Sequence, residues 1–178
     1  MVKLVRWGIL GTGRIADRFI VDLKKVPGAE TLAVASRSHT RAEFFAAKHH
    51  IPQIYSSYEE LVKDPEIDVI YIATPHNFHK EHTLLCLTNG KHVLCEKPFA
   101  VNAKEARQMI AYAREKNLFL MEAMWSMFNP VYQRAMQWVN EGLIGEVRML
   151  KADFGFRTAW QPEGRLLNPA LAGGSILD

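Results

Sequence analysis

The chain has 178 residues, of which 48% are hydrophobic, 23% charged and 10% aromatic. These proportions are typical of a globular protein and exclude disordered, collagen-like and coiled-coil chains. The 22 basic and 19 acidic residues leave a net charge of +3, which by itself supplies no basic face for nucleic acid or a membrane surface. No apolar run approaches the ~20 residues of a membrane-spanning helix, and the N-terminus lacks the pattern of a signal peptide. The two cysteines have no metal-ligand spacing, so we expect no metal site and free thiols in a reducing cytoplasm.

Short apolar runs alternate with amphipathic helical stretches over residues 1–123. Strands are predicted at 4–10, 31–36, 67–74, 92–96 and 118–122, with helices between them. Because these strands are apolar on both faces, they indicate a parallel sheet covered by helices on both sides. Right-handed crossovers make such a sheet doubly wound, so residues 1–123 are interpreted as an α/β domain of the Rossmann type.

Three of the predicted helices begin with a capping pattern, in which a polar side chain accepts a hydrogen bond from a free backbone N–H of the first turn. The pairs are Thr40 with Glu43, Ser57 with Glu60, and Asn102 with Glu105. We therefore expect each helix to begin directly after the first residue of its pair.

The pattern changes after residue 123. Asn129 followed by Pro130 predicts a helix that ends at Gly142, and residues 146–154 alternate like a half-buried strand. One helix with one or two strands cannot bury a core alone. Residues 124–178 are therefore interpreted as the start of a second domain, within which the chain is cut short.

A glycine-rich loop joins the first predicted strand to the first helix. Residues 11–16 read GTGRIA, a GxGxxA pattern in which Gly11 permits a tight turn, Gly13 lets the backbone approach a pyrophosphate, and Ala16 allows close helix packing. The helix N-terminus adds free N–H groups and a partial positive charge. We expect Gly11, Thr12, Gly13, Arg14 and Ile15 to contact a dinucleotide; a purely structural tight turn is the alternative.

The end of the second strand bears on the choice of coenzyme. An acidic residue is expected about 20 residues after the loop for the ribose of NAD, but the chain has Ser36, Arg37 and Ser38 there. A guanidinium flanked by hydroxyls suits a 2′-phosphate, so Ser36 and Arg37 favour NADP over NAD. In the alternative, Arg37 only solvates the turn and stacks on adenine, and NAD is used.

Polar residues also follow the strands predicted at 67–74 and 92–96. Thr74 and Pro75 end the first of these, and Asn77 and His79 lie near the start of the next helix, where capping is the alternative role for Asn77. The second strand ends in Cys95-Glu96-Lys97-Pro98. Lys97 could exchange a proton near neutrality if burial or a cationic neighbour lowered its pKa, whereas a surface ion pair of Glu96 with Lys97 is the alternative. Cys95 is interpreted as a core residue.

Together these motifs resemble the Gfo/Idh/MocA oxidoreductase family. The resemblance rests on GTGRIA (11–16), ATPHNFH (73–79), CEKP (95–98), MEAMWSMFNP (121–130) and GGSILD (173–178). Within the family, the chain looks most like its dimeric dihydrodiol dehydrogenases and NADP-dependent xylose dehydrogenases. The resemblance implies an N-terminal Rossmann domain that binds NADP, with NAD possible. It also implies a C-terminal α/β domain whose mostly antiparallel sheet covers the nicotinamide and often forms a homodimer.

The resemblance also implies roles for individual residues. Lys97 is the proton donor and acceptor, before a cis Pro98, and Glu96 holds the nicotinamide ribose. Thr74, Pro75 and His79 line the coenzyme, and Trp125, Asn129 and Asp178 belong to the substrate pocket, whereas the family's partner for Lys97 falls beyond Asp178. The implied reaction is hydride transfer with a secondary alcohol or hemiacetal of a sugar or trans-dihydrodiol. The alternatives are a non-catalytic NADP sensor and a nicotinamide-assisted glycosidase of the same fold.

Overall fold

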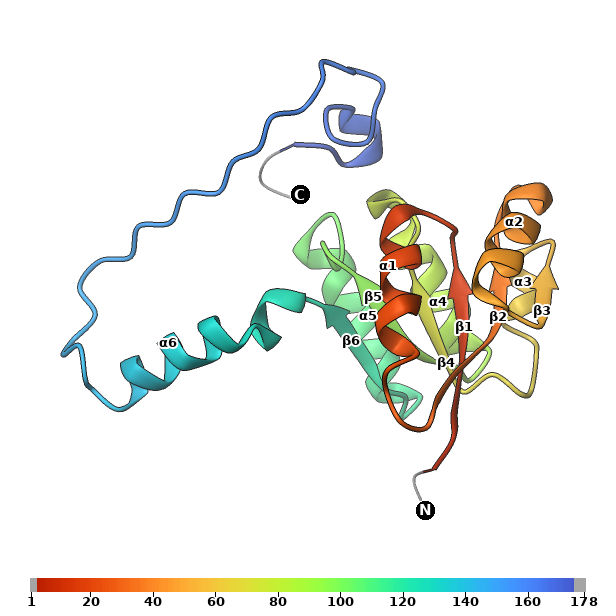
Figure 1. The fold of residues 1–178 in the computed structure, drawn as a ribbon, viewed down its shortest axis with the longest axis horizontal. Helices are drawn as coiled ribbons and strands as arrows, with labels where there is room; N and C mark the ends of the chain where they lie inside the picture. Colours follow the sequence, from red (N-terminus) through yellow and green to blue (C-terminus); the bar gives the residue numbers. More distant parts are fainter. Residues whose placement is uncertain (1–2, 175–178) are drawn as a thin grey trace.

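The computed structural model describes residues 3–174, and its centre is one parallel sheet (Figure 1). The sheet has six strands in the order β3-β2-β1-β4-β5-β6, and every neighbouring pair is parallel. The strands are β1 (Val5–Leu10), β2 (Ala29–Ala35), β3 (Gln53–Tyr55), β4 (Val69–Ile72), β5 (His92–Glu96) and β6 (Leu120–Ala123). This strand order, with a reversal at β1, confirms the predicted doubly wound α/β fold.

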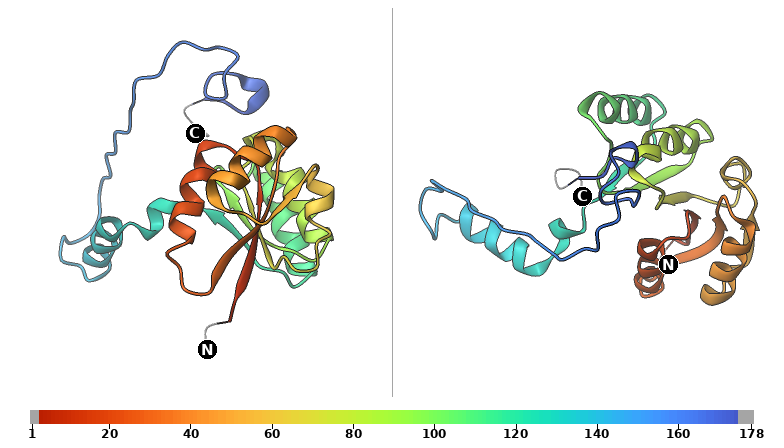
Figure 2. Two further views of the ribbon diagram at one scale, coloured as in Figure 1. Left: turned by 45° about the vertical axis from the view of Figure 1, so that its right-hand side comes forward. Right: turned by 90° about the horizontal axis from the view of Figure 1, so that it is seen from above.

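Helices cover both faces of the sheet (Figure 2). They are α1 (Arg14–Leu23), α2 (His39–His49), α3 (Tyr58–Leu61), α4 (His79–Thr88) and α5 (Ala103–Glu115). α6 (Pro130–Asn140) extends away from the sheet (Figure 1), and the 3₁₀ turns are η1 (His76–Phe78), η2 (Trp125–Phe128) and η3 (Pro169–Leu171). α1 and α2 pack on the face that contains Ile9 and Tyr71, whereas α3, α4 and α5 pack on the face that contains Leu10 and Ile70. Neighbouring residues of one strand therefore enter different cores, which is why these strands are apolar on both faces.

The sequence correctly predicts five of these strands and misses β3. That strand has only three residues, and its middle side chain, Ile54, is partly exposed. Its pairing with β2, in which Gln53 lies beside Ala33, makes it a strand. A segment this short carries no periodic signal of its own, so its conformation depends on its neighbour.

The helix caps are predicted correctly at α3 and α5 but wrongly at α2. Ser57 and Asn102 accept hydrogen bonds from the backbone N–H groups three residues later. α2 begins two residues earlier than expected, because Ser38 accepts the bond from Arg41 N at 3.4 Å. Thr40 therefore lies inside the first turn and does not cap the helix.

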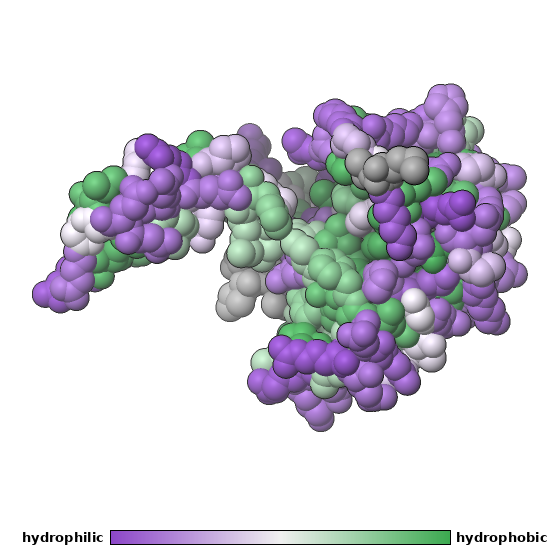
Figure 3. Space-filling view, turned by 90° about the horizontal axis from the view of Figure 1, so that it is seen from below, coloured by the Kyte–Doolittle hydropathy of each residue, from purple (hydrophilic) through white to green (hydrophobic). Residues whose placement is uncertain are grey.

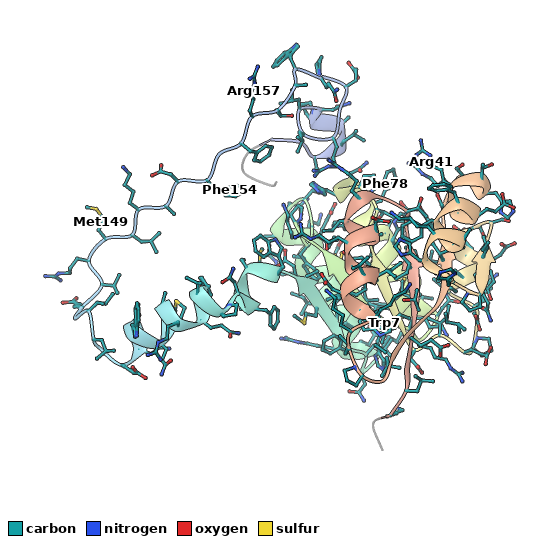
Figure 4. The ribbon with its side chains drawn as sticks, viewed as in Figure 1. Trp7, Arg41, Phe78, Met149, Phe154 and Arg157 are labelled. Atoms are coloured by element: carbon teal, nitrogen blue, oxygen red, sulfur yellow. The ribbon has the colours of Figure 1, made fainter. Side chains whose placement is uncertain are left out.

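The second half of the chain departs most from expectation. α6 forms with Asn129 as its cap, but the strand predicted at 146–154 is wrong, since residues 147–160 have no regular secondary structure. A strand needs a hydrogen-bonded neighbour, and no described segment pairs with this one. The segment runs out beyond α6 and returns toward the sheet at η3 (Figure 1), and its Met149, Phe154 and Arg157 side chains point into open space (Figure 4).

Exposed apolar side chains gather in this second half. The hydropathy surface shows hydrophobic residues on α6 and across the middle of the face seen from below (Figure 3). Trp160 and Phe154 are 82% and 89% exposed. Within residues 3–174, no helix combines the length and apolarity needed to cross a bilayer.

Candidate functional site

Residues that follow the parallel strands line one large cavity at the carboxyl edge of the sheet. Its volume is about 970 Å³, which is at the upper end of the range for small-molecule sites. It is lined by Gly11, Thr12, Gly13, Arg14, Ile15, Arg18, Ser36, Arg37, Ser38, Arg41, Tyr58, Ala73, Thr74, Pro75, His76, Glu96, Lys97, Trp125 and Arg165. The structure thus brings together most of the residues that the sequence singled out, at the edge where Rossmann folds bind ligands.

The glycine loop, residues 11–16, contributes Gly11 to Ile15 to the lining of this cavity. Gly11 has φ +95°, and a Cβ there would lie 2.9 Å from the Ala73 carbonyl oxygen, so packing alone requires a glycine. Gly13 has an ordinary φ of −79°, and a Cβ there would meet nothing within 4 Å. A purely structural turn therefore explains Gly11 but not Gly13. No side chain caps α1, so its first N–H groups remain available to an anion.

Basic residues dominate the end of the cavity near β2. Arg37 and Arg41 line it, and Glu96, at the opposite end, is the one carboxylate among the described lining residues. The Arg37 guanidinium lies 5.7 Å from the centre of the Phe78 ring. Figure 4 shows Phe78 and Arg41 at the same end of the sheet. This end of the cavity suits a dianionic phosphate.

Two hydroxyls join the glycine loop to the basic end. Thr12 Oγ1 donates to Ser36 Oγ at 3.4 Å, and Ser36 Oγ also accepts from Ser38 N at 3.3 Å. Ser36 is buried, and its side chain links the glycine loop to the loop that follows β2.

The Glu96-Lys97-Pro98 turn lies at the other end of the cavity. The Lys97–Pro98 peptide bond is cis, as the family resemblance implied. The Tyr71 hydroxyl donates to Glu96 Oε1, and Glu96 Oε2 accepts from Lys97 N at 3.2 Å. Both carboxylate oxygens are therefore held at the cavity wall.

Two more side chains, those of His79 and Glu122, form hydrogen bonds with the backbone of the same turn. His79 is fully buried, and its Nδ1 and Nε2 lie 2.8 Å from Pro98 O and 2.9 Å from Thr74 O. Glu122 Oε1 accepts from Phe99 N at 2.8 Å. His79 thus joins the ends of β4 and β5 to each other and does not line the cavity.

Two further residues selected from the sequence, Asn77 and Asn129, lie outside the cavity lining. Asn77 neither lines the cavity nor caps α4, and its Oδ1 is buried without a hydrogen-bond partner in the described structure. Asn129 Oδ1 accepts from Val131 N at 2.9 Å, so its side chain caps α6. Asp178 lies outside the described residues.

Several lining residues were not predicted from the sequence. Arg18 follows Arg14 by one turn of α1, so helical spacing would have found it. Arg41 lies in the first turn of α2, whereas Arg37 precedes that helix, so no helical spacing connects the two. Tyr58 and His76 carry no comparable signal. Arg165, 89 residues beyond His76, reaches the cavity rim from the segment before η3, where its Nη1 lies 3.1 Å from His76 Nε2.

Burial controls the ionisation of groups behind the cavity wall. Burial raises the pKa of the Cys95 thiol to about 12, so that Cys95 is a core thiol, as predicted. Burial also lowers the pKa of His82 to about 4, and its Nδ1 lies 2.9 Å from Thr74 Oγ1. Cys86 and Cys95 are both free and buried. Across residues 3–174 no three potential metal ligands cluster together.

Comparison with known proteins identifies the family of this chain. Residues 5–124 match the model of an oxidoreductase family with an NAD-binding Rossmann fold. The chain belongs to the Gfo/Idh/MocA family. This confirms the resemblance found in the sequence, and residues 5–124 include β1 through β6 and the Glu96-Lys97 turn.

Individual relatives agree with this family. The chain is similar to trans-1,2-dihydrobenzene-1,2-diol dehydrogenases: it is 46% identical over 175 residues to that of Xenopus laevis and 46% over 176 residues to that of Homo sapiens. These alignments cover 97% and 98% of the chain, respectively, and 52% of each relative. The chain therefore spans about half the length of the curated relatives it matches.

Solved structures of two family enzymes are also similar. KijD10, a 3-ketoreductase from Actinomadura kijaniata solved with NADP and TDP-benzene, matches with a TM-score of 0.77 and 33% identity, covering 82% of this chain and 45% of that one. Myo-inositol 2-dehydrogenase from Lactobacillus plantarum matches with a TM-score of 0.75 and 26% identity, covering 82% and 43%.

The two loop glycines should respond differently to alanine. Gly11→Ala should lower the free energy of unfolding by about 2 kcal/mol, because it combines a positive φ with a backbone clash. Gly13→Ala should change it by less than about 0.5 kcal/mol, since the new methyl group meets open space. Urea unfolding of both variants measures this. Equal losses would contradict the distinction between a structural Gly11 and an accessible Gly13.

Acid should destabilise the protein partly through His82. The unfolded chain takes up a proton near pH ~6.5 that the folded His82, with its pKa of about 4, excludes, so stability falls as the pH drops from about 6.5 to 4. His82→Gln should make this fall shallower, because glutamine takes up no proton in either the folded or the unfolded state. Urea unfolding at pH 7, 6 and 5 measures the slope. Identical slopes for His82→Gln and the parent protein would refute this origin.

Proposed function

We propose that this protein is a dehydrogenase that transfers a hydride between NADP and a secondary alcohol or hemiacetal carbon of a sugar or trans-dihydrodiol. The observation that carries the proposal is that one cavity joins the glycine loop, the arginine-rich end and the Glu96-Lys97 turn. The proteins that it resembles include some named as diol dehydrogenases and a 3-ketoreductase solved with NADP. Because the chain spans about half of those relatives, activity must be tested and not transferred from them.

The cavity fits a dinucleotide that lies across the edge of the sheet. The open backbone at Gly13 and the uncapped start of α1 suit the pyrophosphate. The nucleotide then extends toward β2 with its adenosine half and toward β4 and β5 with its nicotinamide half. When bound, the nicotinamide would supply the redox chemistry by giving or taking the hydride.

The basic end of the cavity supports NADP as the coenzyme. Arg37 and Arg41 would bind the 2′-phosphate, and Ser36 and Ser38 would add hydroxyl or backbone contacts. A carboxylate that could accept from the ribose hydroxyls of NAD is absent from this end among the described lining residues. Thr74 and Pro75 would contact the coenzyme further along the cavity.

Lys97 is the proposed acid and base. It lines the cavity beside Glu96, at the end where the nicotinamide would lie, so its amine can relay the proton of the substrate hydroxyl. Glu96 would accept a hydrogen bond from the nicotinamide ribose. The protein's contribution is therefore alignment of the two reacting carbons and a placed proton carrier.

The substrate would enter beside Trp125. This side chain lines the cavity and is 64% exposed, which offers an apolar ring face to a sugar or diol.

We also propose that residues 124–178 begin a substrate and dimerisation domain after a Rossmann domain of residues 1–123, with a homodimer as the assembly. The exposed apolar side chains of the second half support this division, and the two free thiols support a cytoplasmic location.

Coenzyme preference tests the role of the arginines. The protein should bind NADPH at least ~10-fold more tightly than NADH, and Arg37→Ala should remove most of that difference by losing a charge-assisted contact to the 2′-phosphate. Arg107→Ala, at an exposed arginine of α5, serves as the control. Fluorescence titration with each coenzyme gives the dissociation constants. Tighter binding of NADH would overturn the assignment of NADP.

Substitution of Lys97 separates binding from chemistry. Lys97→Met should reduce kcat by at least ~100-fold, because the proton carrier is lost, while the dissociation constant for NADPH stays within about twofold. Lys104→Met, at an exposed lysine of α5, should leave both unchanged. Turnover is followed by NADPH absorbance with a panel of aldopyranoses and trans-diols. Binding of NADPH without turnover of any substrate would favour a sensor, and sugar release without net NADPH formation would favour a glycosidase.

A further inference from the structure

The side chain of Tyr71 joins the core of the sheet to the wall of the cavity. Tyr71 lies on β4, the strand between β1 and β5, and only 1% of it is exposed. Its ring stacks on Phe19 of α1 with ring centres 3.8 Å apart. No sequence pattern marks it as functional, because an aromatic residue in a buried strand usually belongs to the core.

The register of the sheet directs the Tyr71 hydroxyl toward the cavity. Tyr71 pairs with Leu94 on β5, and Glu96 lies two residues further along that strand, hence on the same face. The hydroxyl donates to Glu96 Oε1, diagonally across the two neighbouring strands β4 and β5. Tyr71 is therefore buried, and its hydroxyl donates a hydrogen bond to a carboxylate that lines the cavity.

The hydroxyl is a permanent donor. Burial, together with the nearby negative charge of Glu96, raises the pKa of Tyr71 far above its ordinary value. The phenol therefore keeps its proton at every working pH. Because Lys97 N donates to the other oxygen, the carboxylate has one fixed orientation, with its remaining lone pairs available at the cavity wall.

We propose that Tyr71 is a positioning residue for coenzyme binding, which holds the Glu96 carboxylate ready for the hydroxyls of the nicotinamide ribose. This inference rests on the proposed function, since it assigns the nicotinamide half of the nucleotide to the Glu96 end. Tyr71 does not touch the ligand. It acts by removing the rotational freedom that Glu96 would otherwise lose on binding, which is preorganisation.

A double-mutant cycle with two ligands tests the proposal. Tyr71→Phe removes only the hydroxyl and keeps the ring that stacks on Phe19, so the fold is retained. We expect it to weaken NADPH binding by about tenfold, because binding would then have to immobilise a Glu96 side chain that Tyr71 no longer holds. Glu96→Gln should weaken NADPH binding at least as much. The double variant should bind NADPH no more weakly than Glu96→Gln alone, because Tyr71 acts through Glu96.

The second ligand is adenosine 2′,5′-bisphosphate, which has no nicotinamide ribose. Its dissociation constant should stay within about twofold in all three variants, whereas a general loss of structure would weaken both ligands. Tyr55→Phe is the matched control, since its hydroxyl also lies 2.9 Å from a carboxylate, that of Asp64, outside the cavity lining. It should leave the affinity for both ligands unchanged.

The outcomes separate this inference from the proposed function. Failure of the parent protein to bind NADPH would overturn both. Normal NADPH binding by Tyr71→Phe, equal weakening of both ligands, or additive effects in the double variant would overturn the role of Tyr71 alone and leave the proposed function standing.

Discussion

The position of the cavity depends on how closely the first loop approaches the neighbouring strand ends. Gly11 N donates to Ala35 O at 2.9 Å on one side, and Ala73 N donates to Leu10 O at 2.8 Å on the other. These bonds extend the sheet pairing to the last residue before the turn, so the loops after β1, β2 and β4 leave the sheet at the same level. The Ala73 carbonyl then leaves no room for a side chain on Gly11. Everything that lines the cavity is placed relative to this contact.

The cavity is electrostatically divided along the edge of the sheet. Arg37, which follows β2, and Arg41 of α2 lie at one end, and the carboxylate and amine of the Glu96-Lys97 turn lie at the other. A ligand with phosphates at one end and hydroxyls at the other matches this division. The uncapped N-terminus of α1 lies between the two ends, where its dipole adds to the attraction for an anion. This division of charge supports the dinucleotide orientation proposed above.

The turn that carries Lys97 is held by side chains from three other elements. Tyr71 on β4, His79 on α4 and Glu122 on β6 each bond to an atom of residues 96–99. A half-buried turn held by these three side chains has little freedom, which is what the proposed proton carrier requires. Trp125 and Arg165 extend the cavity wall from beyond β6, so the second half of the chain also contributes to the site.

The sequence by itself determined the doubly wound fold, the glycine loop and the chemical character of the two cavity ends. Local patterns suffice for these features, because apolar periodicity, glycine spacing and a basic residue after a strand act over a few residues. It did not determine β3 or the absence of a strand at 146–154, since each depends on pairing with a strand that is distant in the sequence. The cap of α2 was missed for a local reason, because Ser38 and Thr40 are both suitable cap residues two positions apart. Only the tertiary structure placed His79 behind the wall, brought Arg165 to the rim and joined Tyr71 to Glu96. Those contacts are made by strand register and chain crossing, which bring residues together across long separations that no local pattern encodes.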